Sequence, residues 1–209
     1  MVGDSAGQIA VWDSTTKQLL NELRLGNAGI NSLDLSNDET IALISNGSEI
    51  ILWDYQSSDD PRRLIGHTEI VWEAKFNAQA TLIGSASADG TLRVWDADTS
   101  QEVQQFAHPQ ASRTLAFSPD GSLIASGSND GIIRLWNIRE NQMAVVLNGH
   151  DGEVLSLEFS PDGSFLLSGS SDQSAVLWEL SSASAKHQYD GHTGAVTHVA
   201  FSANGQQAL

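Results

Sequence analysis

The sequence predicts an all-β fold made of five repeated units, each a four-stranded antiparallel sheet. Short apolar runs alternate with turn residues, as where Val154–Phe159 is followed by Ser160-Pro161-Asp162-Gly163, and this pattern is typical of meandering strands. One run in each unit ends on a tryptophan, and these tryptophans recur at separations of 41, 42, 41 and 42 residues: Trp12, Trp53, Trp95, Trp136 and Trp178. A period of about 40–45 residues with four strands per unit indicates the blades of a β-propeller.

The fifth unit contains every part of the pattern. Gly149-His150 precedes its first strand, the turn at 160–163 reverses the chain, and Asp172 lies in the turn between its second and third strands. A run at 185–189 supplies the fourth strand. The second unit, 26–53, is degenerate, because Asn27 stands where the histidine is expected and the turn at 45–49 lacks an aspartate.

The Gly-His pairs, the aspartate turns and the strand-ending tryptophans of these units resemble the WD-repeat (Trp-Asp repeat) β-propeller family. The resemblance covers the whole chain and implies a single propeller domain over residues 1–209, with five repeat equivalents that are circularly offset within a blade. The matching residues are Trp12-Asp13, Trp53-Asp54, Trp95-Asp96, Trp136-Asn137 and Trp178-Glu179, with Gly66-His67, Gly149-His150 and Gly191-His192 upstream.

The two ends of the chain supply complementary parts of one unit. Residues 8–13 and 17–25 match third and fourth strands, whereas 195–201 matches a first strand and 206–209 begins a second. Intact units count 19 residues from the first-strand phenylalanine to the tryptophan, and joining Leu209 to Val2 gives the same 19 from Phe201 to Trp12. We therefore expect one blade to be split between the termini.

This split leaves three closures open. One chain closes as a five-bladed ring, two chains join into a ten-bladed ring, or the chain is a piece of a longer array. Exposed strand edges must be covered, and large tryptophan-filled wedges favour rings of many blades. The hypothesis that we favour is the homodimer.

Composition limits the class of partner. The 209 residues include 26 acidic and 10 basic side chains, for a net charge of −16, which disfavours nucleic acid and anionic membrane surfaces and favours a neutral or basic protein. No apolar run approaches the roughly 18 residues of a membrane span. The absence of cysteine excludes disulfides and thiolate metal sites and fits a reducing compartment, so we expect a cytoplasmic protein.

Histidine, aspartate and serine recur together, as in His67, Asp89 and Ser87, and invite a hydrolase interpretation. A catalytic triad is needed once, however, and this set occurs in three consecutive units. The family resemblance implies instead a buried hydrogen-bond network in each blade, and a buried imidazole and carboxylate are tolerated when they satisfy each other. We therefore expect no enzymatic activity. By resemblance the network comprises His67, Asp89 and Trp95; His108, Asp130 and Trp136; and His150, Asp172 and Trp178, with serines from Ser85/Ser87, Ser126/Ser128 and Ser168/Ser170, and with His192 and Trp12 in the closing unit.

Motifs for cofactors are weak. The run 96–100 begins like a calcium loop, but Gln101 occupies the position that requires glycine and no glutamate follows at the twelfth. No phosphate loop, nucleophile elbow or dinucleotide fingerprint stands out. We expect no metal and no cofactor.

Trp72 is the one tryptophan outside the repeat register. It lies four residues before Phe76, at the start of an innermost strand, and is therefore expected near the central channel. The resemblance implies that this face binds partner proteins, and a set containing Trp and Arg has the composition of interface hot spots. A locally packed Trp beside a solvated Arg is the alternative. The predicted partner-binding residues are Trp72, Arg113, Leu155, Thr197 and Asn31.

The function predicted from these features is a non-enzymatic scaffold for protein–protein interaction. The alternative is a structural or engineered repeat fragment that assembles with itself into a ten-bladed ring and has no ligand of its own.

Overall fold

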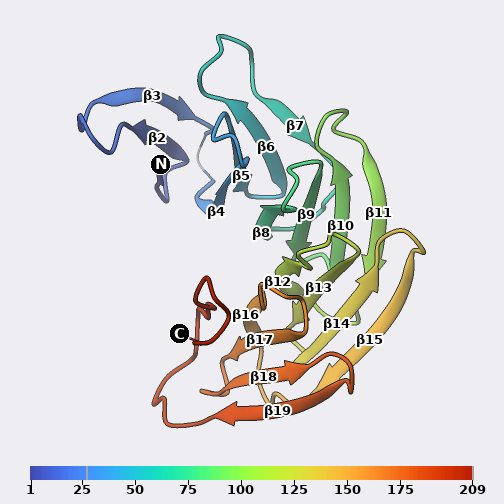
Figure 1. The fold of residues 1–209 in the computed structure, drawn as a ribbon. Helices are drawn as coiled ribbons and strands as arrows, with labels where there is room; N and C mark the ends of the chain where they lie inside the picture. Colours follow the sequence, from blue (N-terminus) through green and yellow to red (C-terminus); the bar gives the residue numbers. More distant parts are fainter. Residues whose placement is uncertain (27, 209) are drawn as a thin grey trace.

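The computed structural model describes residues 1–26 and 28–208, and in this part of the chain five antiparallel sheets follow one another around a common hub (Figure 1). The first sheet has three strands, β1 (Val2–Gly3), β2 (Gln8–Trp12) and β3 (Leu19–Arg24). Each of the other four sheets has four strands, paired in chain order as the meander pattern predicts. Asn27 and Leu209, to which the sequence assigned a degenerate position and a strand end, lie outside the described residues.

The four complete sheets repeat one arrangement, with the first strand at the hub and the fourth at the rim (Figure 1). The inner strands β4, β8, β12 and β16 are followed outward by two middle strands and an outer strand. Their bounds are β4 (Ile30–Leu35), β5 (Ile41–Asn46), β6 (Glu49–Asp54), β7 (Arg62–Leu64); β8 (Val71–Phe76), β9 (Leu82–Ser87), β10 (Thr91–Asp96), β11 (Glu102–Ala107); β12 (Ser112–Phe117), β13 (Leu123–Ser128), β14 (Ile132–Asn137), β15 (Gln142–Asn148); β16 (Val154–Phe159), β17 (Phe165–Ser170), β18 (Ala175–Glu179) and β19 (Ser184–Tyr189).

The apolar core lies between successive sheets. Leu43 of the second sheet clusters with Trp95 of the third, and Leu135 of the fourth clusters with Trp178 of the fifth. Trp95 and Trp178 are only 2% and 1% exposed, whereas Trp12 of the first sheet is 49% exposed. Each buried indole packs toward the preceding sheet, and no described sheet precedes the first. A blade of this kind is therefore stable only with a neighbour, because its apolar face must be covered.

The pairing of third and fourth strands shifts register at the tryptophan. The shift occurs between Val94 and Trp95, and it recurs immediately before Trp12, Trp136 and Trp178. Such a bulge adds a residue on one strand and increases the local twist. In four of the five sheets the repeated tryptophan position therefore marks both the packing residue and a register shift, whereas no shift occurs between β6 and β7 of the second sheet.

The ends of the chain depart from the predicted strands. Residues 195–200 form no assigned strand, although Val196 and Val199 are buried against the fifth sheet and the Val199 amide donates to Ser156 Oγ at 3.2 Å. The predicted turn does form, with the Gly205 amide donating to the Ser202 carbonyl at 2.8 Å. The segment occupies an inner-strand position but lacks a long partner strand, which explains the absence of a regular ladder.

The sheets do not close into a ring. The N-terminal sheet and the C-terminal segment lie on opposite sides of an opening in the arc (Figure 1). The first sheet thus has three strands where four were expected, and the blade shared between the termini stays a prediction.

Candidate functional site

The predicted partner-binding side chains meet at the hub, where the second residue of each inner strand borders one hollow. This hollow has a volume of about 280 Å³ and is called here the Trp72 hollow. Its lining contains all five predicted residues and two more: Asn31, Trp72, Arg113, Leu155 and Thr197, with Ser32 and Glu73. Four sheets and the C-terminal segment therefore contribute one position each to the same surface.

Arg113 stacks on Trp72. The guanidinium carbon lies 4.2 Å from the ring centroid, which is within the range of a cation–π interaction. Both side chains are half-buried, while Asn31 and Thr197 are exposed. Asn31 Nδ2 donates to the Val71 carbonyl at 3.0 Å, which joins the second and third sheets beside the hollow. The result is a surface that presents an indole and a guanidinium together.

Glu73 supports this surface from behind. Its carboxylate accepts from Thr114 Oγ1 at 2.7 Å and from the Leu115 amide at 2.8 Å, and it pairs with Lys75 Nζ at 2.7 Å. These contacts hold β8 against β12, so that Trp72 and Arg113 are brought side by side. Glu73 was not among the predicted partner-binding residues, although its position two residues after the start of β8 was the available signal.

The predicted blade network is present in the third and fifth sheets. In the third, Trp95 Nε1 donates to Ser85 Oγ at 2.8 Å, and Ser85 Oγ lies 2.8 Å from His67 Nε2. His67 Nδ1 lies 2.8 Å from Asp89. Since a carboxylate only accepts, Nδ1 carries the proton and Nε2 accepts from the serine hydroxyl.

The fifth sheet repeats this chain of contacts. His150 lies 2.9 Å from Asp172 and 2.7 Å from Ser168 Oγ, and Trp178 Nε1 donates to the same Oγ at 2.8 Å. Each complete network thus runs from an indole through a serine and an imidazole to a carboxylate, and every buried polar atom in it has a partner.

Burial sets the charge states in the third sheet. It lowers the pKa of His67, an effect that the hydrogen bond to Asp89 opposes. Burial alone would raise the pKa of Asp89, but hydrogen bonds from Thr91, His67 and the Thr68 amide hold it at about 2. The pair is therefore a neutral imidazole beside an ionised carboxylate.

The fourth sheet corrects one predicted contact, because His108 does not bond to Asp130. Arg134 lies between them, with Nη1 at 3.4 Å from His108 Nδ1 and Nη2 at 2.8 Å from Asp130 Oδ2. The other contacts remain, with Ser126 Oγ at 2.9 Å from His108 Nε2 and from Trp136 Nε1.

The substitution that accompanies this change is in the turn. Thr91 and Ser174 donate hydroxyls to the aspartates of the third and fifth sheets, whereas the fourth sheet has Ile132 at this position. Burial and, to a smaller extent, the nearby charge of Arg134 lower the pKa of His108 to about 4.

The closing unit does not form a network. His192 is exposed, and Trp12, on the other side of the opening, is half-exposed. The prediction that these two residues belong to one buried network is wrong for this arrangement, because the sheets that would bring them together are not closed.

The network serines are inaccessible to substrate. Ser85 and Ser87 are fully buried, and Ser87 Oγ donates to the Glu69 carbonyl at 3.2 Å. The third-sheet triad considered for a hydrolase therefore has no hydroxyl at a surface.

Within residues 1–26 and 28–208, no group of three or more histidine, aspartate or glutamate side chains is arranged to hold a metal ion. The same part of the chain contains no helix long and apolar enough to cross a membrane.

Comparison with known proteins gives one family. The family model described as "WD domain, G-beta repeat" matches residues 59–96, 100–137, 141–179 and 183–209. Each of the first three matches begins at the end of one sheet and includes the three inner strands of the next, as 59–96 includes β7 to β10.

Three curated relatives illustrate the similarity. The U3 small nucleolar RNA-associated protein 21 homolog of Schizosaccharomyces pombe is 26% identical over 113 residues, or 54% of this chain and 12% of that protein. The U4/U6 small nuclear ribonucleoprotein PRP4 of Saccharomyces cerevisiae is 32% identical over 108 residues, or 48% and 23%. The serine-threonine kinase receptor-associated protein of Homo sapiens is 39% identical over 54 residues, or 26% and 15%. The aligned part is less than a quarter of each relative's length.

Proposed function

Because the chain belongs to the family described as "WD domain, G-beta repeat", we propose that it is a non-enzymatic scaffold that binds another protein at the Trp72 hollow. The observation that carries this proposal is the convergence of Trp72 and Arg113 with residues from three other hub positions on one surface. A scaffold needs an accessible surface that presents anchoring side chains, and the stacked Trp72 and Arg113 at the hollow support this role.

The names of the relatives support an assembly role. Those proteins are named for association with a small nucleolar RNA, a small nuclear ribonucleoprotein and a kinase receptor. For this chain we propose a protein partner, with no direct contact to nucleic acid or membrane, because the net charge of −16 disfavours polyanions. A neutral or basic partner and a cytoplasmic location fit the same composition.

Trp72 is the expected hot spot of the interface. Truncating a tryptophan of this kind costs about 2 kcal/mol or more, which corresponds to roughly 30-fold in Kd. The experiment is capture of partners from a lysate by the wild-type chain, identification by mass spectrometry, and Kd measurement with the purified partner. Trp72→Ala and Arg113→Ala are expected to lose binding while keeping the wild-type circular dichroism spectrum.

Arg139→Ala is the matched control for Arg113→Ala, because it removes an exposed arginine on the turn after β14. It should bind as the wild type does. If Trp72→Ala and Arg113→Ala bind equally well, the Trp72 hollow is not the partner site.

A second candidate function is self-association, favoured by the half-exposed Trp12 and the three-stranded first sheet at one end of the arc. We propose that residues 1–209 form one domain whose two ends are completed by a second copy, as a ten-bladed ring. Light scattering after size exclusion then gives twice 22.4 kDa. A monomer mass would rule out the homodimer and leave the other two closures, a five-bladed ring of one chain and a piece of a longer array.

A further inference from the structure

Side chains cross between neighbouring inner strands at the hub in a repeated pattern. The Asp34 carboxylate, at the fifth position of β4, accepts from the Phe76 amide at the sixth position of the next inner strand, at 2.8 Å. Glu158, at the fifth position of β16, accepts in the same way from the Phe201 amide at 2.9 Å. A carboxylate at the fifth position is therefore the acceptor for the following phenylalanine amide.

These amides need such an acceptor because they point away from their own sheets. Hydrogen-bonded and non-hydrogen-bonded pairs alternate along an antiparallel ladder. The Asn77 amide bonds to the Leu82 carbonyl at 2.9 Å, so the adjacent pair of Phe76 and Ile83 is non-hydrogen-bonded. The N–H group of Phe76 consequently faces the neighbouring inner strand.

The same geometry applies to Phe117 and Phe159. The Ser118 amide bonds to the Leu123 carbonyl at 3.0 Å, and the Ser160 amide bonds to the Phe165 carbonyl at 2.9 Å. Phe117 and Phe159 are the preceding residues, and their N–H groups therefore also face the hub.

Neither of these two amides has a carboxylate opposite it. The fifth positions of the preceding strands are Lys75 and Ala116. Lys75 cannot accept, and it donates to the Leu115 carbonyl at 3.4 Å, while Ala116 has no polar atom. In the part of the chain that the structure describes, no side chain accepts from the Phe117 or Phe159 amide.

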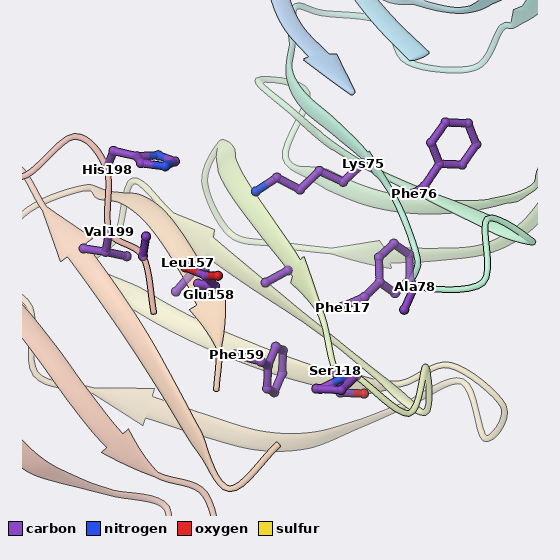
Figure 2. A pocket seen from close by; sticks show the side chains of 13 residues that line it. Lys75, Phe76, Ala78, Phe117, Ser118, Leu157, Glu158, Phe159, His198 and Val199 are labelled. Atoms are coloured by element: carbon purple, nitrogen blue, oxygen red, sulfur yellow. The ribbon is translucent and has the colours of Figure 1, made fainter. Parts of the chain in front are cut away.

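A hollow of about 420 Å³ lies at this place, and it is called here the Ala116 hollow. Its lining includes Ala116, Phe117 and Phe159, together with Lys75 and His198. Figure 2 shows the Lys75 and His198 side chains extending into the same space, with Phe159 on its wall. The volume lies within the roughly 300–1,000 Å³ that is typical of ligand sites.

We propose that the Ala116 hollow binds the carboxylate of an acidic side chain carried by a partner protein segment. The carboxylate takes the place over Ala116 that Asp34 and Glu158 hold at other hub positions, and it accepts from the Phe159 amide. Charge-assisted bonds of this type are roughly twice as strong as neutral ones. Lys75, which also pairs with Glu73 at 2.7 Å, supplies a cation on the same side.

Glu158 also lines the hollow, and its repulsion limits where the ligand lies. Its Oε2 is engaged by the Phe201 amide, toward the C-terminal segment. The incoming carboxylate is therefore held on the side of Lys75 and β12. This site lies at the opposite end of the inner strands from the Trp72 hollow, and it does not depend on partner binding there.

The test is a titration of the intact chain with a blocked amino acid, followed by the amide resonances in ¹⁵N-resolved NMR spectra. The probe is N-acetylglutamate amide, and N-acetylglutamine amide is its neutral match. A single residue is expected to bind with a Kd on the order of millimolar. The glutamate probe should move the Phe159 amide proton downfield in a saturable manner, and the glutamine probe should bind at least fivefold more weakly.

Two amides serve as internal controls, because those of Phe76 and Phe201 already bond to carboxylates and should not shift. Equal binding of the two probes would overturn the proposal. So would shifts of equal size at all three phenylalanine amides, or an unmoved Phe159 amide.

Variants separate the site from a general salt effect. Ala116→Leu fills the hollow and should abolish the shift, whereas Ala107→Leu on the outer strand β11 should leave it unchanged. Ala116→Asp supplies the carboxylate within the chain, so the Phe159 amide should lie downfield without probe and no longer respond. Lys75→Met keeps the hollow's shape and should weaken binding at least threefold. If Ala116→Leu loses its native spectrum, a Lys75→Met variant that binds as the wild type does would still refute the proposal.

Discussion

Ser168 joins two buried polar side chains of the fifth sheet, Trp178 and His150, and its removal should be costly. Its Oγ is fully buried, accepts from Trp178 Nε1 at 2.8 Å and lies 2.7 Å from His150 Nε2, to which it donates. Ser168→Ala leaves an indole N–H and an imidazole nitrogen without partners. A buried group left unsatisfied costs about 1–3 kcal/mol, and the two together should cost about 2–4 kcal/mol after local relaxation.

The measurement is thermal and urea unfolding followed by circular dichroism. For a chain of this length each kcal/mol moves Tm by about 2–4 °C, so a loss near 3 kcal/mol lowers Tm by roughly 6–12 °C. Ser182→Ala, in the exposed turn before β19, is the matched control and should lie within about 0.5 kcal/mol of the wild type.

The network also predicts coupling between its members. Ser168→Ala and Trp178→Phe remove the same hydrogen bond, and their combined cost should be smaller than the sum of the single costs. If Ser168→Ala unfolds within error of Ser182→Ala, or if the double variant is additive, the serine is not the centre of a network and the account of the blade is refuted.

Three further predictions concern charge and packing. Because the pKa of His108 is lowered to about 4 from 6.5, its contribution to stability is complete above about pH 6.5 and is lost as pH falls toward 4. The free energy of unfolding, measured in urea, should change with pH in this range by up to about 1.4 kcal/mol per pH unit, and a His108→Asn variant should lack this dependence. An unchanged slope in the variant would contradict the assignment of the pH dependence to His108. The pKa of Asp172 is lowered to about 2 from 3.8, so its contribution to stability is present above about pH 4 and is lost as pH falls through 2. Asp172→Asn should therefore flatten an acid unfolding curve, followed by circular dichroism, in that range. A Cβ at Gly127 would lie 2.6 Å from Val154 Cγ1, so Gly127→Ala should cost about 1–3 kcal/mol in a thermal melt, whereas Gly194→Ala, with open space around it, should change little.

The position of Arg134 shows how a repeat tolerates a lost hydroxyl at Ile132. With Ile132 in the turn, Asp130 loses the bond that Thr91 and Ser174 provide in neighbouring sheets. The Arg134 guanidinium supplies two donors to the carboxylate instead. The carboxylate remains paired, at the expense of its contact with His108, and a pH-sensitive histidine is the consequence.

Much of the fold could be predicted from repetition. The tryptophan period predicted five sheets, and the turns at Asp162-Gly163 and its equivalents predicted where strands reverse. Local chemistry determines these features, because turn residues and apolar alternation act over a few positions. The contacts of His67 and His150 were expected from the resemblance to the WD-repeat family, and their partners lie within about one repeat.

Other features of the site could not be predicted in this way. The stacking of Arg113 on Trp72 joins residues 41 positions apart, and the residue type at either position does not indicate the other. The position of the Arg134 side chain between His108 and Asp130 could not be predicted from residue 134, because the substitution that accompanies it lies at another residue, Ile132. The exposed positions of Trp12 and His192 depended on whether the ends of the arc meet.

Local sequence patterns predict the blades and the strand order within them, because turn residues and the burial of one apolar face act over a few positions. The histidine–serine–tryptophan contacts were predicted from the family resemblance. Three features depend on how whole sheets are arranged in space: the arc is open (Figure 1), the inner strands bring Trp72 and Arg113 to one hollow, and Ala116 leaves the Phe159 amide facing another hollow. These outcomes depend on the angle and spacing between whole sheets, which are set by side-chain packing summed over many residues.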